Sequence, residues 1–170
     1  PAGATPLSDY DPRVVSDLAA DFPDINWEIV HGGITFPEEV SMMVGNFDNI
    51  YVNLGITSIF AHTSPGRFKD ILGGILQAGG RDAISQITWS PETAIVHPQP
   101  LIEAFWELDL TGLEGWFGSV DITQEDKERI LGENWAEMRG EDVDDLRSRF
   151  EDDEFSDAEV SAPFSPTSVS

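Results

Sequence analysis

His31 and Glu92 are the two side chains of this sequence whose types and positions suit acid–base chemistry. His31 closes the stretch EIVHGG and Glu92 lies in TWSPET, each after a short apolar run. Histidine changes charge near neutral pH, and a carboxylate beside it can act as base, partner or ligand. The pair therefore indicates proton transfer or ligation of a divalent metal ion. The alternative for His31 is a place before a tight turn made by the next two glycines. The alternative for Glu92 is a helix-start or solvent-facing carboxylate.

Strands that alternate with helices would position these groups. Apolar and β-branched runs predict strands over residues 25–31, 49–54 and 83–89. Helical spacing of apolar residues predicts helices over residues 11–22, 36–47, 66–78, 98–108 and from Thr123 onward. This order favours right-handed βαβ units and an α/β fold with a parallel sheet. Three strands leave two long sheet edges, so the chain is either a compact three-layer domain or part of a larger closed barrel.

The carboxyl ends of parallel strands gather functional groups at one edge of the sheet. This rule brings His31 and Glu92 to one opening, and it adds Asn53 from the second strand and Trp89 from the third. His62, in the segment after the second strand, is a further candidate. We expect these last three side chains to bind a small-molecule substrate. His31 and Glu92 would be catalytic, and Glu92 is also the candidate metal ligand.

The composition excludes several classes of function. The chain carries 32 acidic and 9 basic residues, a net charge of −23, so it would repel nucleic acid and anionic membranes. It has no cysteine, which excludes disulfides, thiolate catalysis and cysteine-based zinc sites. No signal peptide or membrane span is recognisable, so we expect a cytoplasmic protein. The motifs of P-loop, dinucleotide-binding, HExxH and GxSxG proteins are missing from the sequence.

The character of the chain changes near residue 141. Residues 141–159 hold ten acidic residues and two arginines, and serine, proline and valine finish the chain. We predict one marginal helix over 141–150 and an extended or disordered tail over 151–170. The predicted organisation is therefore an α/β unit over 1–140 and an acidic helix and tail over 141–170. A partner chain is one way to hold such a tail.

Three stretches, in order, resemble the metal-dependent amidohydrolase superfamily. They are the strand end HGG, the next strand NIYVN, and ILGEN within ITQEDKERILGENWAEM. The similar branch is the amidohydrolase-related group that includes aminocarboxymuconate-semialdehyde decarboxylase, and the likeness covers about residues 11–139. That resemblance implies a TIM-type (β/α)8 barrel, of which this chain would hold the C-terminal portion, about three βα units. It also implies that a divalent metal, with zinc the candidate, serves hydrolysis or non-oxidative decarboxylation of a small carbonyl, amide or carboxylate substrate.

The resemblance also implies roles for individual residues. His31 matches the sixth-strand histidine, which contacts the metal-bound water or the substrate. Glu92 falls where the family has an aspartate ligand, so the carboxylate is kept with one more methylene. The family's other ligands, an H-x-H pair on the first strand and a histidine on the fifth, precede the matched region. Most ligands would thus come from an N-terminal half-barrel polypeptide or subunit, in a hetero-oligomer.

Two other functions remain open at this stage. The chain is a non-catalytic structural or assembly subunit of a larger enzyme complex if the exchange of aspartate for glutamate has removed the metal site. It is a small α/β binding domain if the three strands form a self-contained sheet.

Overall fold

The computed structural model describes residues 6–149, and a three-stranded parallel sheet lies at its centre. The strands are β1 (Trp27–Ile29), β2 (Ile50–Asn53) and β3 (Ile87–Thr88), in the spatial order β1-β2-β3. Trp27 pairs with Ile50, and Val52 pairs with Ile87. The predicted α/β class with parallel strands is confirmed. In the described part of the chain, β1 and β3 each pair with no strand other than β2.

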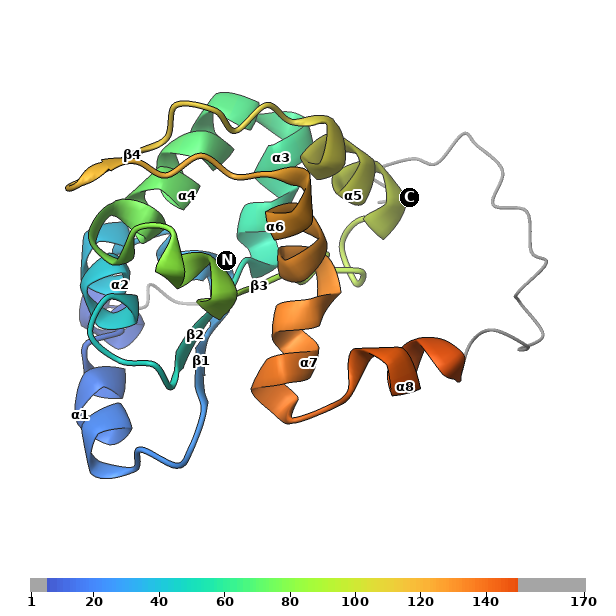
Figure 1. Cartoon of the computed structure of the whole chain (residues 1–170). Coiled ribbons are helices and arrows are strands. Elements are labelled where there is room, and N and C mark those ends of the chain that lie inside the picture. The colour runs from blue at the N-terminus through green and yellow to red at the C-terminus, as the bar shows by residue number, and fades with distance from the viewer. Residues whose placement is uncertain (1–5, 150–170) are drawn as a thin grey trace.

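Helices flank the sheet and join its strands, and Figure 1 shows α1, α2 and α4 together on one side of it. The helices are α1 (Val14–Asp21), α2 (Pro37–Val44), α3 (Ile59–Thr63), α4 (Pro65–Gly79), α5 (Pro98–Glu107), α6 (Gln124–Glu128), α7 (Asn134–Arg139) and α8 (Val143–Ser148). The short 3-10 segments are η1 (Leu7–Tyr10), η2 (Val30–Gly33), η3 (Gly55–Ser58) and η4 (Asp82–Gln86), and a π-helical turn, Arg129–Glu133, joins α6 to α7. The predicted helices agree with these bounds to within a few residues, except that α3 was not predicted.

Two predicted strands are too long. The first ends at Ile29 because His31, Gly32 and Gly33 all adopt left-handed backbone conformations, which no strand accommodates. The third keeps only Ile87–Thr88, since residues 82–86 form a 3-10 segment. There the buried Asn134 side chain donates hydrogen bonds to the carbonyls of Ile84 and Ile87 and satisfies backbone groups that a strand partner would otherwise take.

The two faces of the sheet differ in polarity because side chains alternate along a strand. Ile29, Val52 and Ile87 share one face and pack into the core, where α4 buries five apolar residues. Those five are Phe68, Ile71, Leu72, Ile75 and Leu76. The opposite face carries Glu28, Tyr51, Asn53 and Thr88. The core thus fixes the strand positions, and the second face is left for polar groups.

A capping box starts α6. The Thr123 hydroxyl accepts a hydrogen bond from the Asp126 amide, and the Asp126 carboxylate accepts one from the Thr123 amide at 2.7 Å. Arg81 donates two further bonds of 2.9 Å to the same carboxylate. The next residue, Lys127, is buried, and its ammonium donates hydrogen bonds to the carbonyls of Trp106 and Leu108 at the end of α5. The start of α6 is therefore tied both to the segment after α4 and to the end of α5.

Asp126→Asn is expected to destabilise the fold by roughly 2 kcal/mol at pH 7, the scale of a lost hydrogen bond to a charged group. Burial is the largest influence on the pKa of Asp126 and raises it, but the bonds from Thr123 and Arg81 together outweigh burial and lower the pKa. A carboxyl whose pKa is lowered by folding stabilises the fold above its unfolded pKa of about 3.9. That stability is lost as pH falls through the folded pKa.

Urea unfolding at pH 7 and at pH 3 measures this effect. The difference in unfolding free energy between the wild type and Asp126→Asn should be smaller at pH 3 than at pH 7. Glu125→Gln is the control, because Glu125 is an exposed acid in the same first turn. A loss of stability for Asp126→Asn that is the same at both pH values would contradict the charged role of Asp126.

The C-terminal part of the described chain holds one element that was not predicted and one that was. An antiparallel hairpin of β4 (Glu114–Gly115) and β5 (Gly118–Ser119) projects from the body near the end of α4 (Figure 1). The predicted acidic helix over 141–150 is α8, with Asp142 as its N-cap. The predicted tail over 151–170 lies outside the described residues. No helix within residues 6–149 has both the length and the apolar composition to cross a membrane.

Candidate functional site

His31 is held at the end of β1 by an unusual turn. Its backbone is left-handed (φ 66°, ψ 17°), and Gly32 and Gly33 continue in the same conformation. Gly33 is required there, since a Cβ atom would lie 2.5 Å from a methyl of Val40. The Thr57 hydroxyl donates to the His31 carbonyl at 2.8 Å and ties the turn to the segment after β2. His31, which is not a glycine, is thus held in a strained conformation by its surroundings.

Glu92 meets His31 across the end of the sheet. Its Oε1 lies 3.7 Å from His31 Nδ1, and the Glu92 backbone is also left-handed, with φ 48°. Among residues 6–149, these two are the only non-glycine residues with positive φ. Such strain costs of the order of 1–3 kcal/mol per residue and clusters at functional sites. The structure therefore brings together the two residues predicted to be catalytic, and both have a left-handed backbone conformation.

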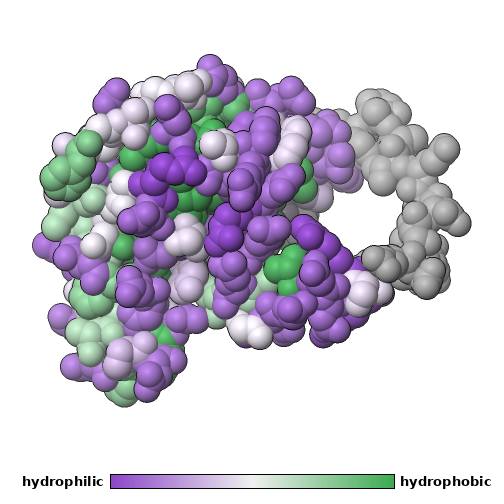
Figure 2. Space-filling view, viewed as in Figure 1, coloured by the Kyte–Doolittle hydropathy of each residue, from purple (hydrophilic) through white to green (hydrophobic). Residues whose placement is uncertain are grey.

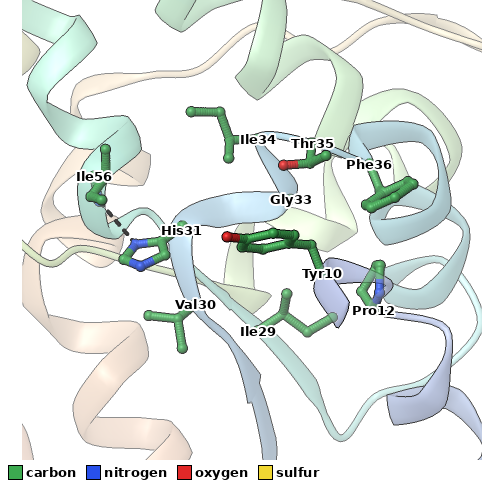
Figure 3. A pocket seen from close by; sticks show the side chains of 10 residues that line it. All are labelled: Tyr10, Pro12, Ile29, Val30, His31, Gly33, Ile34, Thr35, Phe36 and Ile56. Atoms are coloured by element: carbon green, nitrogen blue, oxygen red, sulfur yellow. Dashed lines mark hydrogen bonds between the residues drawn. The ribbon is translucent and has the colours of Figure 1, made fainter. Parts of the chain in front are cut away.

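The Ile56 amide sets the hydrogen-bonding state of the imidazole. It donates to His31 Nδ1 at 3.2 Å, and Figure 3 shows the ring turned toward Ile56. An Nδ1 atom that accepts a hydrogen bond carries no proton, so the neutral ring is assigned its proton on Nε2. Nε2–H is then free to donate to a ligand. If Nδ1 gains a proton, the carboxylate of Glu92 is the nearby acceptor.

Gly55 makes room for this arrangement. A Cβ atom on Gly55 would lie 2.5 Å from His31 Nδ1 and 3.1 Å from Glu92 Oε1. Residue 55, two positions after β2, therefore has to be glycine for the imidazole and the carboxylate to approach each other. Its amide donates to Asn53 Oδ1 at 2.8 Å, which fixes the segment that carries Ile56.

Glu28 holds Asn53 and, through it, the segment that follows β2. It was not predicted as a site residue. Its Oε1 accepts hydrogen bonds from Asn53 Nδ2 at 3.0 Å and from the buried Thr88 hydroxyl at 3.1 Å. The three strands thus share one polar cluster, which leads through Asn53 to Gly55. Glu28 could have been found from the sequence, because it is a charged residue inside the otherwise apolar stretch WEIV. The Ile56 amide has no such signal, since any residue type supplies a backbone N–H.

The structure places the three predicted substrate contacts differently from one another. Asn53 uses both ends of its amide to hold Glu28 and Gly55. The Trp89 side chain is 9% exposed and stacks on Phe105, with ring centroids 4.8 Å apart. His62 is exposed on α3, and no hydrogen bond or ion pair within the described residues joins it to His31 or Glu92. A substrate contact by each of these residues stays a prediction.

An apolar cavity of about 270 Å³ lies beside the turn (Figure 3). It is bounded by the end of β1, the turn after it, the start of α2 and the N-terminal segment. Its lining includes Tyr10, Pro12, Ile29, Val30, His31 and Phe36. No charged group other than a protonated His31 lines it, so this hollow suits an uncharged, apolar part of a ligand.

A metal ion does not fit the residues of this site on their own. Residues 6–149 contain no group of three or more histidine, aspartate or glutamate side chains able to hold an ion. Only His31 and Glu92 meet at the site, and the Nδ1 lone pair of His31 is engaged by the Ile56 amide. Zinc needs at least three protein ligands in catalytic sites. His31 and Glu92 therefore do not make a metal centre by themselves.

Comparison with known proteins gives one result. The family model described as amidohydrolase matches residues 5–138, which is most of the chain and includes the whole site. No curated protein and no solved structure matches the chain.

Proposed function

Since this chain belongs to the amidohydrolase family, we propose that it carries part of the active site of a hydrolase-like enzyme, with His31 and Glu92 as its catalytic pair. The family match itself supports a hydrolase-like function. The finer proposal is hydrolysis or non-oxidative decarboxylation of a small carbonyl, amide or carboxylate substrate. The observation that carries it is the strained contact of His31 with Glu92 at the carboxyl end of a parallel sheet.

His31 supplies the proton chemistry in this proposal. With Nδ1 held by the Ile56 amide, Nε2–H donates to the oxygen of a bound carbonyl or carboxylate group and polarises it. When Nδ1 takes up a proton in place of its bond from the Ile56 amide, Glu92 at 3.7 Å stabilises the positive charge. Nε2–H can then pass its proton to a leaving group, which leaves the ring neutral with its proton on Nδ1. Glu28, Asn53 and Gly55 keep the imidazole in place and contact no reacting atom.

The remaining strands of the barrel are proposed to come from a partner, an N-terminal half-barrel polypeptide or subunit. Support comes from the edge of β1, which pairs with no strand within residues 6–149, and from the polar face of the sheet, because a closed barrel pairs every strand edge and keeps one face of each strand inside. A divalent metal, with zinc the candidate, would then take most of its ligands from that polypeptide. When bound, it would activate water or polarise a carbonyl.

The second candidate function is a non-catalytic assembly subunit in a larger complex. One observation favours it: the two donors that meet at the site do not make a metal centre by themselves. The two functions differ in what the assembled protein contains and does, so metal content and turnover separate them.

The test uses the full chain isolated, with whatever polypeptide accompanies it, from the cells that naturally produce it. We expect one equivalent of zinc per assembly, and we expect Glu92→Ala to lose it. His31→Asn should keep the zinc and reduce the turnover of small p-nitrophenyl ester and p-nitroanilide probes by about 100-fold or more. His97→Asn is the matched control, because His97 caps the start of α5 through the Gln99 amide and asparagine can take over that cap.

Two results would contradict the catalytic proposal. One is a stoichiometric complex that holds no metal when grown in zinc-replete medium, which is the result expected of an assembly subunit. The other is unchanged turnover in His31→Asn, which would remove His31 from the chemistry.

A further inference from the structure

The apolar cavity beside the catalytic pair is built on the same turn that holds His31. His31 and Ile56, the two ends of the hydrogen bond that fixes the imidazole, both line this hollow of about 270 Å³. The turn also positions another part of the wall, because the Phe36 amide donates to the Gly33 carbonyl at 2.8 Å. Figure 3 shows the Tyr10 and Phe36 rings on the side of the hollow away from Ile56. A group bound in the cavity therefore lies directly beside the ring that is proposed to act on the substrate.

The lining of this cavity favours an uncharged group. Among the described residues that line it, none is aspartate, glutamate, lysine or arginine. The polar side chains in the lining belong to Tyr10, Thr35 and His31, and the others are aliphatic, aromatic or proline. Moving a charged group out of water into such surroundings, without an opposite charge to meet it, is strongly unfavourable.

The charge of the whole chain opposes an anionic group in the same place. The sequence holds 32 acidic and 9 basic residues, and Figure 2 shows hydrophilic residues over most of one face of the molecule. Within the described lining, a protonated imidazole of His31 is the single possible cation, and the Glu92 carboxylate 3.7 Å away already neutralises it. A ligand group that carries a carboxylate is therefore repelled by the acidic protein and finds no counter-charge in the cavity.

The volume of the hollow limits the group that fits. An apolar protein cavity of about 150 Å³ takes up benzene. The present cavity is larger, at about 270 Å³, so it has room for a phenyl ring with a small substituent or for a branched alkyl group. The Phe36 ring forms part of its wall, and a larger side chain at this position would take up some of that room.

We propose that this cavity determines substrate specificity: it receives an uncharged aryl or branched alkyl group attached to the reacting carbonyl, and Phe36 sets the size of that group. The inference rests on the proposed function, because it takes the His31 imidazole as the group that meets the carbonyl. It narrows the substrate from small carbonyl, amide or carboxylate compounds to those whose attached group is uncharged and apolar. Tyr10 and Phe36 contact that group and no reacting atom.

Binding of two related amides to the assembled protein tests the proposal without turnover. The amides are 4-methylphenylacetamide and 4-carboxyphenylacetamide, which share a ring and a carbonyl group and differ in the charge at the far end of the ring. We expect the carboxylate to bind at least about tenfold more weakly, because it enters apolar surroundings without a counter-charge. The methyl compound should also shift the NMR signals of the Ile56 amide and the His31 ring, which would locate it in the cavity.

Thr35→Lys supplies the missing charge. Thr35 is an exposed residue of the lining, so a lysine there keeps the fold and can bring its ammonium group to the carboxylate. The preference for the methyl compound should fall by roughly fivefold, the effect of one ion pair near a surface. Thr63→Lys is the matched control, because Thr63 is exposed on α3 and does not line the cavity, so the same added charge should leave the preference unchanged.

Phe36→Trp tests the size limit. The larger indole ring takes up room in the hollow, so we expect 4-methylphenylacetamide to bind about tenfold more weakly. Phe22→Trp is the control, because Phe22 is half exposed at the end of α1 and does not line the cavity, so its replacement should not change the affinity.

Three binding results would each overturn the proposal. They are equal affinity for the two amides, a preference that Thr35→Lys leaves unchanged, and binding that leaves the His31 and Ile56 signals in place.

Turnover separates a failure of this inference from a failure of the proposed function. We expect kcat/KM to be at least about tenfold higher for p-nitrophenyl phenylacetate than for p-nitrophenyl acetate. Equal kcat/KM values for the two esters would leave the catalytic function in place and overturn the role of the cavity. Binding of 4-methylphenylacetamide at His31 with no turnover of either ester would support the cavity as a binding site and overturn the catalytic function.

Discussion

Gly55→Ala is expected to displace the His31 imidazole and to lower the stability of the fold slightly, because Gly55 has φ 20°, at the edge of the region that favours glycine. The new Cβ atom would lie 2.5 Å from His31 Nδ1, closer than Cβ atoms in proteins come to other heavy atoms. The imidazole can yield by turning about the bonds of its side chain. The ring therefore moves, and the bond from the Ile56 amide and the approach to Glu92 are lost. A misplacement of about 1 Å in a catalytic group costs of the order of 100-fold in rate. We expect a loss of that size in the turnover of the assembled enzyme.

This prediction has a readout that does not need the substrate. The chain has three histidines, so the ring nitrogens of His31 can be resolved by NMR, and the amide of Ile56 reports on its bond to Nδ1. Both sets of signals should shift in Gly55→Ala. Gly66→Ala is the matched control, since nothing lies within 4 Å of that position. If the His31 and Ile56 signals of Gly55→Ala stay in place, then Gly55 does not hold the site open.

Phe105→Ala is expected to cost about 3–5 kcal/mol of unfolding free energy, the largest stability effect among the substitutions considered. Phe105 is fully buried on α5, packs edge-on against Phe68 with centroids 5.7 Å apart, and stacks on Trp89. The Lys127 ammonium lies 5.9 Å from the centroid of the same ring. Removal of the ring leaves a cavity between α4, α5 and the residue after β3. Both ring–ring contacts found within residues 6–149 involve Phe105.

Urea unfolding followed by circular dichroism measures the loss, and near-ultraviolet signals report on Trp89. Phe22→Ala is the control of equal chemistry, because Phe22 is half exposed at the end of α1 and its loss should cost well under 1 kcal/mol. A cost for Phe105→Ala as small as that of Phe22→Ala would mean that Phe105 does not pack against Phe68 and Trp89 in the core.

The sequence alone predicted the helices well where the apolar residues are periodic. The helical face of α4 and the helix that begins at Thr123 were both predictable, because helix formation depends on neighbours a few residues apart. The lengths of β1 and β3 could not be predicted from the sequence. A strand ends where its backbone partners end, and those partners, such as the Asn134 side chain, lie far along the chain.

For the site, the sequence determined the chemistry and the tertiary structure decided the geometry. The residue types at the ends of the predicted strands named His31 and Glu92, and the parallel order of the strands placed them at one edge. Only the folded chain showed that both are held with left-handed backbones, 3.7 Å apart, around Gly55. Only the fold likewise buried Trp89 under Phe105 and set Glu28 beneath Asn53. The physical reason is that side-chain contacts depend on the packing of strands and helices distant in sequence, which local patterns do not encode.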